Sequence, residues 1–203
     1  MLKKPNERLK RQRAGGDPDV SMMSRQELLY HISDLPLKYQ ALVAFLYLTG
    51  CRVSELVGNK SRDYPRKPIF RHQVERTFFN NVPILMIKDV PVLKRKSNMT
   101  RNVPVVIERE KPFVDILLAY IKNMGMDDVL FPMTRQTAWK IVNKQLGLWP
   151  HYFRHLRNTH LTREYGLSGH ELKNFNGWAS AMMADNYVHL NWRDIASKMI
   201  QKS

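Results

Sequence analysis

The chain has 203 residues with a hydrophobic content of 43%, which suffices for one domain with a core and is too little for two full-sized domains. Its formal net charge of +15 and isoelectric point near 10.1 favour a polyanionic partner, most often nucleic acid. The single cysteine, Cys51, excludes an internal disulfide and cysteine-based zinc sites of the usual spacing, so we expect an intracellular protein. The sequence has no apolar segment typical of a secretory signal or of a membrane span.

Residues 1–20 are expected to form a basic arm, because lysines and arginines crowd them and no apolar face is present. A segment of this composition cannot bury enough apolar surface to fold alone, so it should be disordered without a partner. The arm could follow the phosphates of a nucleic acid or serve as a plain linker, and its composition does not choose between the two.

The apolar pattern of the following region predicts a mostly helical domain. Ser24 and Glu27 have the spacing of a capping box, which places the start of the first helix at Ser24. A short helix is expected from Ser54, and residues 58–72, rich in Lys, Arg and Pro, are expected to form a loop. Further helices are predicted over residues 36–49, 112–123, 134–145, 151–165, 168–175, 180–188 and 191–201.

The middle of the chain is rich in Val, Ile and Phe, and its pattern changes to one typical of strands. Strands over residues 74–79, 84–93 and 101–107 would form a small antiparallel sheet, with residues 94–99 turning between the last two. Together these elements predict an α+β fold, a mostly helical domain with one antiparallel three-stranded sheet.

Several reactive side chains scattered through these elements indicate phosphodiester chemistry. Negative charge builds on the nonbridging oxygens of a phosphate in the transition state, and arginine forks can stabilise it without a metal. Arg52 follows a helix-ending glycine, and His151 and Arg154 share one face of a predicted helix. Tyr187 offers a phenol, so the set predicts a site that holds a phosphate and attacks it with tyrosine.

Two other interpretations fit some of the same residues. Glu55 could form a purely structural ion pair with Arg52, because an unpaired arginine is costly to bury. His155 and His160 lie near His151 in the sequence, so a zinc site competes, but a His-Glu-x-x-His pattern is absent and neighbouring arginines would oppose a cation. We therefore expect no metal and no cofactor.

Four motifs follow one another in a characteristic order. They are Thr-Gly-Cys-Arg-Val-Ser-Glu-Leu at residues 49–56, His-Tyr-Phe-Arg-His at 151–155, Gly-Trp at 177–178, and Tyr-Val-His from Tyr187. In these motifs the chain resembles the tyrosine recombinase (phage integrase) family over about residues 24–190. A catalytic domain over residues 21–190 is therefore expected. Residues 191–203 would form a helical tail that docks on a neighbouring subunit or packs on its own core.

The resemblance implies a role for each residue that matches a motif. Arg52 and Arg154 would clamp the scissile phosphate of double-stranded DNA. Tyr187 would attack that phosphate, giving a 3′-phosphotyrosyl bond and a free 5′-hydroxyl, and His151 would assist proton transfer around the tyrosine. Trp178 would donate its indole N–H to the phosphate, although simple core packing is the alternative for a tryptophan.

In this family a lysine on the hairpin protonates the leaving 5′-oxygen, and two lysines compete for that role. Lys94 and Lys96 would share one face of a regular strand, so alternation does not decide between them. Lys96 stands eight residues before Pro104, the spacing that the family's hairpin usually shows. We therefore prefer Lys96, with Lys94 second.

Some positions depart from the family's usual residues. They lie at 156–158, 175–178 and 182–184, and they affect packing more than chemistry. The helical core-binding domain of most members is missing ahead of the predicted catalytic domain. The chain would therefore be either a catalytic fragment or a naturally short enzyme whose basic arm partly substitutes.

The resemblance implies a site-specific DNA recombinase or integrase from a mobile element or virus. Recombination in this family needs four protomers on two duplexes, and the free protein could be a monomer. Two alternatives remain open at this point. One is a type IB topoisomerase-like or telomere-resolving enzyme, and the other is a noncatalytic DNA-binding relative.

Overall fold

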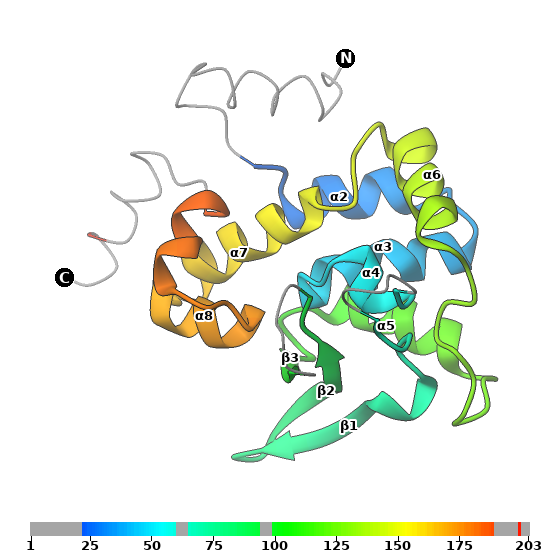
Figure 1. Cartoon of the computed structure of the whole chain (residues 1–203), viewed down its shortest axis with the longest axis horizontal. Coiled ribbons are helices and arrows are strands. Elements are labelled where there is room, and N and C mark those ends of the chain that lie inside the picture. The colour runs from blue at the N-terminus through cyan, green and yellow to red at the C-terminus, as the bar shows by residue number, and fades with distance from the viewer. Residues whose placement is uncertain (1–21, 60–64, 94–98, 189–198, 200–203) are drawn as a thin grey trace.

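The computed structural model describes residues 22–59, 65–93, 99–188 and 199 of the chain (Figure 1). Its helices are α2 (Arg25–Ile32), α3 (Leu37–Thr49), α4 (Val53–Leu56), α5 (Lys111–Ile121), α6 (Arg135–Leu146), α7 (Tyr152–Glu164) and α8 (Gly169–Asn176), with 3-10 helices η1 (Arg71–Gln73) and η2 (Ala181–Asn186). The strands are β1 (Val74–Phe79), β2 (Val82–Pro91) and β3 (Thr100–Val106). The predicted fold class is confirmed, because helices dominate and the three strands form one antiparallel sheet.

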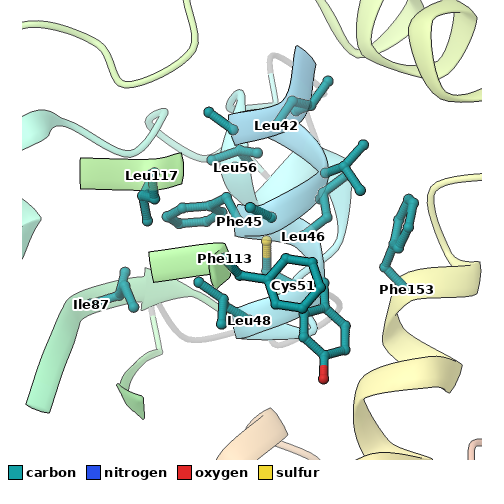
Figure 2. Packing of buried hydrophobic residues seen from close by; sticks show 14 of the residues in the cluster. Leu42, Phe45, Leu46, Leu48, Cys51, Leu56, Ile87, Phe113, Leu117 and Phe153 are labelled. Atoms are coloured by element: carbon teal, nitrogen blue, oxygen red, sulfur yellow. The ribbon is translucent and has the colours of Figure 1, made fainter. Parts of the chain in front are cut away.

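Helix α3 lies at the centre of the hydrophobic core. All of residues 41–49 are buried, since a helix that is apolar on every side must be covered on every side. Helices α5 and α7 pack against it, and α2, α6 and β3 make further contacts. Figure 2 shows Phe45 and Leu46 of α3 beside Phe113 of α5, with Phe153 of α7 on the other side.

A glycine ends α3 and sets the direction of the next segment. Gly50 has a φ of 58°, and its N–H donates to the carbonyl of Leu46. Glycine favours this left-handed conformation because it has no Cβ. The turn buries Cys51 and places Arg52 at the N-cap of α4. Burial raises the pKa of the Cys51 thiol to about 12, so this residue packs as an apolar side chain.

The sheet has the order β1-β2-β3, and both strand pairs are antiparallel. Alternation turns Leu85 and Ile87 of β2 into the core. The register shifts between Ile87 and Val90, where Asp89 has a φ of 49°. In Figure 1 the hairpin of β1 and β2 extends away from the helices. Strand β2 contacts α4, and Leu93, two residues after β2, bonds to Glu55 of α4, so this side of the sheet lies near Arg52.

Local sequence signals predicted most elements, with one change of type. Ser24 and Glu27 form the expected capping box, and a second capping box begins α8. The segment predicted as a helix over residues 180–188 is a 3-10 helix, because its backbone bonds run between residues three apart and the side chain of Ser180 caps its start. The predicted loop over 58–72 ends in η1.

Three predictions fall wholly or largely outside the described residues: the arm over 1–20, the turn over 94–99 and the tail over 191–203. In the part of the chain that is described, no helix combines the length and the apolar character that crossing a membrane would require.

Candidate active site

The start of α4 and the first turns of α7 meet at a shared buried carboxylate. Glu55 Oε1 accepts from Arg52 Nη1 at 2.9 Å, and Glu55 Oε2 lies 3.7 Å from Arg154 Nη1. The backbone N–H of Arg52 donates to Glu55 at 2.8 Å, which ties the arginine to the first turn of α4. Two of the predicted arginines, far apart in the sequence, are thus held beside one carboxylate.

The charge of Glu55 is maintained by its surroundings. Burial alone would raise the pKa of this carboxyl, but Arg154, Arg101 and Arg52 outweigh that effect and hold the pKa below its usual value. The N–H of Leu93 also donates to Glu55 at 3.1 Å. Leu93 is the last described residue before the turn between β2 and β3. Glu55 therefore does form the ion pair with Arg52 that the structural interpretation expected. It also positions Arg154.

Arg154 is fully buried and fixed by carbonyl groups on two sides. Its Nη1 donates to the carbonyl of Gly50 at 2.9 Å, and its Nη2 donates to the carbonyl of Asn176 at 3.4 Å. Burial lowers the pKa of the Arg154 guanidinium to about 10, while Glu55 opposes the change. The side chain therefore stays charged at neutral pH. Its Nε is a buried donor without an acceptor among the described residues.

Tyr187 lies against His151 and Trp178 and is only 8% exposed. His151 Nε2 is 3.3 Å from the Tyr187 hydroxyl, a distance that permits a weak hydrogen bond. The Trp178 ring stacks on the Tyr187 ring with centroids 5.0 Å apart and an interplanar angle of 20°. The Arg154 guanidinium carbon lies 5.5 Å from the centroid of each of these two rings. The Tyr187 side chain therefore lies against an imidazole and near a buried guanidinium.

Five of the six predicted residues come together in this region: Arg52, His151, Arg154, Trp178 and Tyr187. Lys96, the sixth, and its competitor Lys94 lie outside the described residues. Leu93, the last described residue before that turn, contacts the site through its bond to Glu55.

Both interpretations of Trp178 find support in its surroundings. The side chain is 5% exposed and packs with Leu161 and Leu172, as a core tryptophan would. Its indole Nε1 is nevertheless buried without an acceptor in the described part of the chain. A buried indole N–H usually has a partner, so this donor calls for an acceptor that the protein itself does not provide there.

Arg101 is a buried arginine that the sequence interpretation missed. It donates to the carbonyl of Thr49 at 3.1 Å and to the carbonyl of Phe175, and its charge lowers the pKa of Glu55. A signal for it existed, because Arg101 alternates in phase with the buried residues Val103 and Val105 of β3. A charged residue on the inner face of a strand needs such partners.

His155 and His160, which suggested a zinc site in the sequence, have different surroundings in the structure. The His155 ring lies 4.9 Å from the Tyr187 ring, centroid to centroid, and packs beside that tyrosine. His160 is buried elsewhere, between the hydroxyl of Tyr47 and the carbonyl of Met23. Within residues 22–59, 65–93 and 99–188, no three His, Cys, Asp or Glu side chains gather as metal ligands would.

Comparisons with known proteins place this geometry in a family. The model of the phage integrase family matches residues 23–193 of the chain, a span that includes every described site residue. The chain belongs to the phage integrase family. The part of the fold described here is thus a tyrosine recombinase catalytic domain, as the motifs predicted.

Curated relatives are named as tyrosine recombinases, and solved structures share the fold. Tyrosine recombinase XerC of Herpetosiphon aurantiacus is 29% identical over an alignment of 170 residues, and the match covers 76% of this chain and 49% of that protein. The chain spans about half the length of the curated relatives it matches. A XerA recombinase crystal structure is similar with a TM-score of 0.59 and 21% identity, over 89% of this chain and 62% of that one. A XerH recombinase bound to a palindromic difH substrate gives a TM-score of 0.55 and 18% identity, over 87% and 51%. These two structural likenesses show the fold.

Proposed function

We propose that this chain is the catalytic domain of a site-specific DNA recombinase or integrase that cuts and rejoins double-stranded DNA through a covalent tyrosine intermediate. The observation that carries the proposal is the position of Tyr187, whose hydroxyl lies 3.3 Å from His151 Nε2 and whose ring centroid lies 5.5 Å from the Arg154 guanidinium carbon. A phenol next to a base and a fixed cation is what nucleophilic attack on a phosphodiester requires.

Arg52 and Arg154 bind the scissile phosphate in this proposal. Their guanidinium groups are held in advance by Glu55 and by backbone carbonyls, so little reorganisation is needed when charge builds on the nonbridging oxygens. The side chain of Arg52 is 21% exposed and offers the accessible face of the clamp. The unsatisfied N–H groups of Trp178 and Arg154 support the same role, because phosphate oxygens are acceptors that could satisfy them.

Tyr187 attacks the phosphorus atom, and the bond between phosphorus and the 5′-oxygen breaks. The products are a 3′-phosphotyrosyl bond and a 5′-hydroxyl. His151 accepts the phenolic proton, and Lys96, or Lys94 as the second candidate, donates a proton to the leaving oxygen. Attack of a 5′-hydroxyl on the phosphotyrosyl bond reverses these steps and rejoins a strand. The number of phosphoester bonds is unchanged, so no nucleotide triphosphate is consumed.

The proposed partner is double-stranded DNA, with four protomers acting on two duplexes during recombination and a monomer when free. The net charge of +15 suits contacts to the phosphate backbone. The XerH relative is bound to a difH substrate in its solved structure, which supports a duplex as the partner here. We further propose that residues 1–20 follow the DNA backbone and that residues 191–203 dock on a neighbouring protomer.

A covalent-adduct assay tests this function. The purified chain is incubated in EDTA with nicked duplexes taken from the flanks of its own gene, and the products are run on a denaturing gel beside those of Tyr187→Phe. The proposal expects a slower band with the wild type that the variant lacks, while both proteins bind the duplexes equally.

Other outcomes of this assay separate the alternatives. Tight binding without any adduct on any duplex would contradict the catalytic proposal and favour a noncatalytic DNA-binding protein. Adducts without sequence preference, together with relaxation of supercoiled DNA, would favour a topoisomerase-like activity instead.

A further inference from the structure

A pocket of about 480 Å³ opens between α4, α6 and the turn that precedes α7. It combines aromatic rings with cationic side chains. Its principal lining residues are Arg52, Arg135, Trp139, Trp149, Pro150 and His151. This mixture of flat apolar surface and positive charge is the chemistry that recognises a nucleotide, in which a planar base is joined to an anionic phosphate.

The pocket is continuous with the candidate active site. Arg52 and His151 belong to both, one as a phosphate ligand and the other as the neighbour of the Tyr187 hydroxyl. A phosphate bound at Arg52 would therefore bring the sugar and base attached to it to the mouth of the pocket. In a regular duplex this base is stacked between its neighbours and cannot reach the aromatic rings of the pocket. A base that has left the stack could enter the pocket.

Trp139 is the lining residue that argues most directly for nucleotide binding. Its side chain is 48% exposed, although it sits in α6 among charged and polar neighbours. Arg135 lies four residues earlier on the same face of α6, so a ring and a cation are presented side by side. An exposed tryptophan beside an arginine that also lines a concave site is typical of base stacking combined with a phosphate contact.

We propose that this pocket binds one unstacked nucleobase of the nucleotide next to the scissile phosphate, stacked on Trp139 and with Arg135 near its phosphate. The proposal rests on the proposed function, since it places the scissile phosphate at Arg52. Displacing a base from the stack costs a few kcal/mol, and stacking on an aromatic ring offsets part of that cost with little preference for base identity. The pocket would therefore favour DNA that is already distorted at the cleavage point.

Two duplexes test the pocket without requiring cleavage. One carries a single unpaired thymine, and the other carries an abasic residue at the same place, so the phosphates are identical. Binding of both is measured by fluorescence anisotropy in the Tyr187→Phe background, alone and combined with Trp139→Ala. The proposal expects Trp139→Ala to weaken binding of the thymine duplex about tenfold and of the abasic duplex less than twofold, the size typical of one lost stacking contact.

Control variants exclude a general folding defect. Trp139→Tyr should retain most of the thymine preference, because it keeps an aromatic ring. Tyr30→Ala, which removes an exposed aromatic side chain from α2, should change neither affinity. Equal weakening of both duplexes by Trp139→Ala, or no weakening of either, would overturn the proposal.

Failure of the pocket proposal and failure of the proposed function would give different results. Absence of a covalent adduct with the wild-type protein would count against the proposed function, whereas the thymine preference and its loss report only on the pocket.

Discussion

Glu55 and Arg154 form a buried pair in which the carboxylate Oε2 lies 3.7 Å from the guanidinium Nη1, and both side chains are at most 1% exposed. The two residues come from α4 and α7, which the sequence separates by most of the domain. Because Glu55 also bonds Arg52, this one carboxylate fixes the relative positions of both arginines that are proposed to hold the phosphate.

Replacing Glu55 with glutamine should therefore destabilise the fold and slow DNA cleavage together. The change leaves Arg154 buried without its counter-charge, and breaking a buried ion pair in this way costs about 3 kcal/mol. Urea denaturation followed by circular dichroism measures the free energy of unfolding. Glu108→Gln is the matched control, because Glu108 is exposed. Equal stability of the two variants would show that Glu55 does not position the arginines.

Arg154→Lys tests whether the guanidinium fork matters beyond its charge. Lysine keeps the charge but cannot reach the carbonyls of Gly50 and Asn176 while also offering two donors to a phosphate. We expect the rate of adduct formation to fall about 10²- to 10³-fold, the usual effect of removing one oriented charge stabiliser. The rate is followed on nicked duplexes under single-turnover conditions. Arg163→Lys, on the more exposed side of α7, should change it less than threefold, and a similarly small change in Arg154→Lys would count against the clamp.

Gly177 has a close-packed environment that an alanine would disturb. Its φ is 66°, and a Cβ at this position would lie 2.6 Å from Val92 Cγ2, which is closer than real contacts allow. Gly177→Ala should lower the free energy of unfolding by about 2 to 4 kcal/mol, the sum of a left-handed backbone and overpacking. It should also slow cleavage, because Trp178 follows directly.

Gly147 separates these two contributions. Its φ is 63°, but a Cβ there would meet nothing within 4 Å, so Gly147→Ala carries only the backbone cost of about 1 to 2 kcal/mol. The two alanine variants are compared by urea denaturation. Indistinguishable stabilities would mean that Val92 yields without cost and that the close approach is unimportant.

His160 should make the fold sensitive to mild acid. Burial, with the nearby charges of Arg163, Arg25 and Arg157, lowers its pKa from 6.5 to about 3. The unfolded chain binds a proton on this histidine below pH 6.5 and the folded protein does not, so stability falls as pH falls through that range. The loss is up to about 1.4 kcal/mol per pH unit, from pH 6.5 toward pH 3.

The variant His160→Gln isolates this effect between pH 6.5 and 5, above the range in which carboxylates titrate. Its free energy of unfolding should vary less steeply with pH than that of the wild type. His170→Gln, at an exposed position of α8, should keep the wild-type slope. A wild-type slope in His160→Gln would show that this histidine is not the group responsible.

Local patterns in the sequence predicted most of the elements, and five of the six residues named from the motifs lie together in the structure. The capping residue Ser24 and the glycine at position 50 act on their own neighbours, so the ends of α2 and α3 follow from a few adjacent residues. The motif around Arg154 predicted a helix with His151 and Arg154 on one face, and His151, at the N-cap of α7, and Arg154, in its first turn, both lie near Tyr187.

These local patterns could not predict contacts between segments that lie far apart in the sequence. Arg101 joins the site through bonds to the ends of α3 and α8, and nothing in its local sequence names those partners. Trp178 and Tyr187, whose rings stack, lie on either side of η2, and the prediction of a helix over residues 180–188 did not include this contact. The choice between Lys94 and Lys96 stays a prediction, because both lie outside the described residues.

The most direct test of the account is to identify the amino acid and the DNA end that become joined. Covalent complex trapped on a nicked duplex is digested with trypsin and nuclease, and the modified peptide is sequenced by mass spectrometry. The account predicts a single adduct in which the Tyr187 hydroxyl carries the 3′-phosphate of the cleaved strand, with a free 5′-hydroxyl on the other fragment. Attachment to another residue, or to a 5′-phosphate, would contradict it.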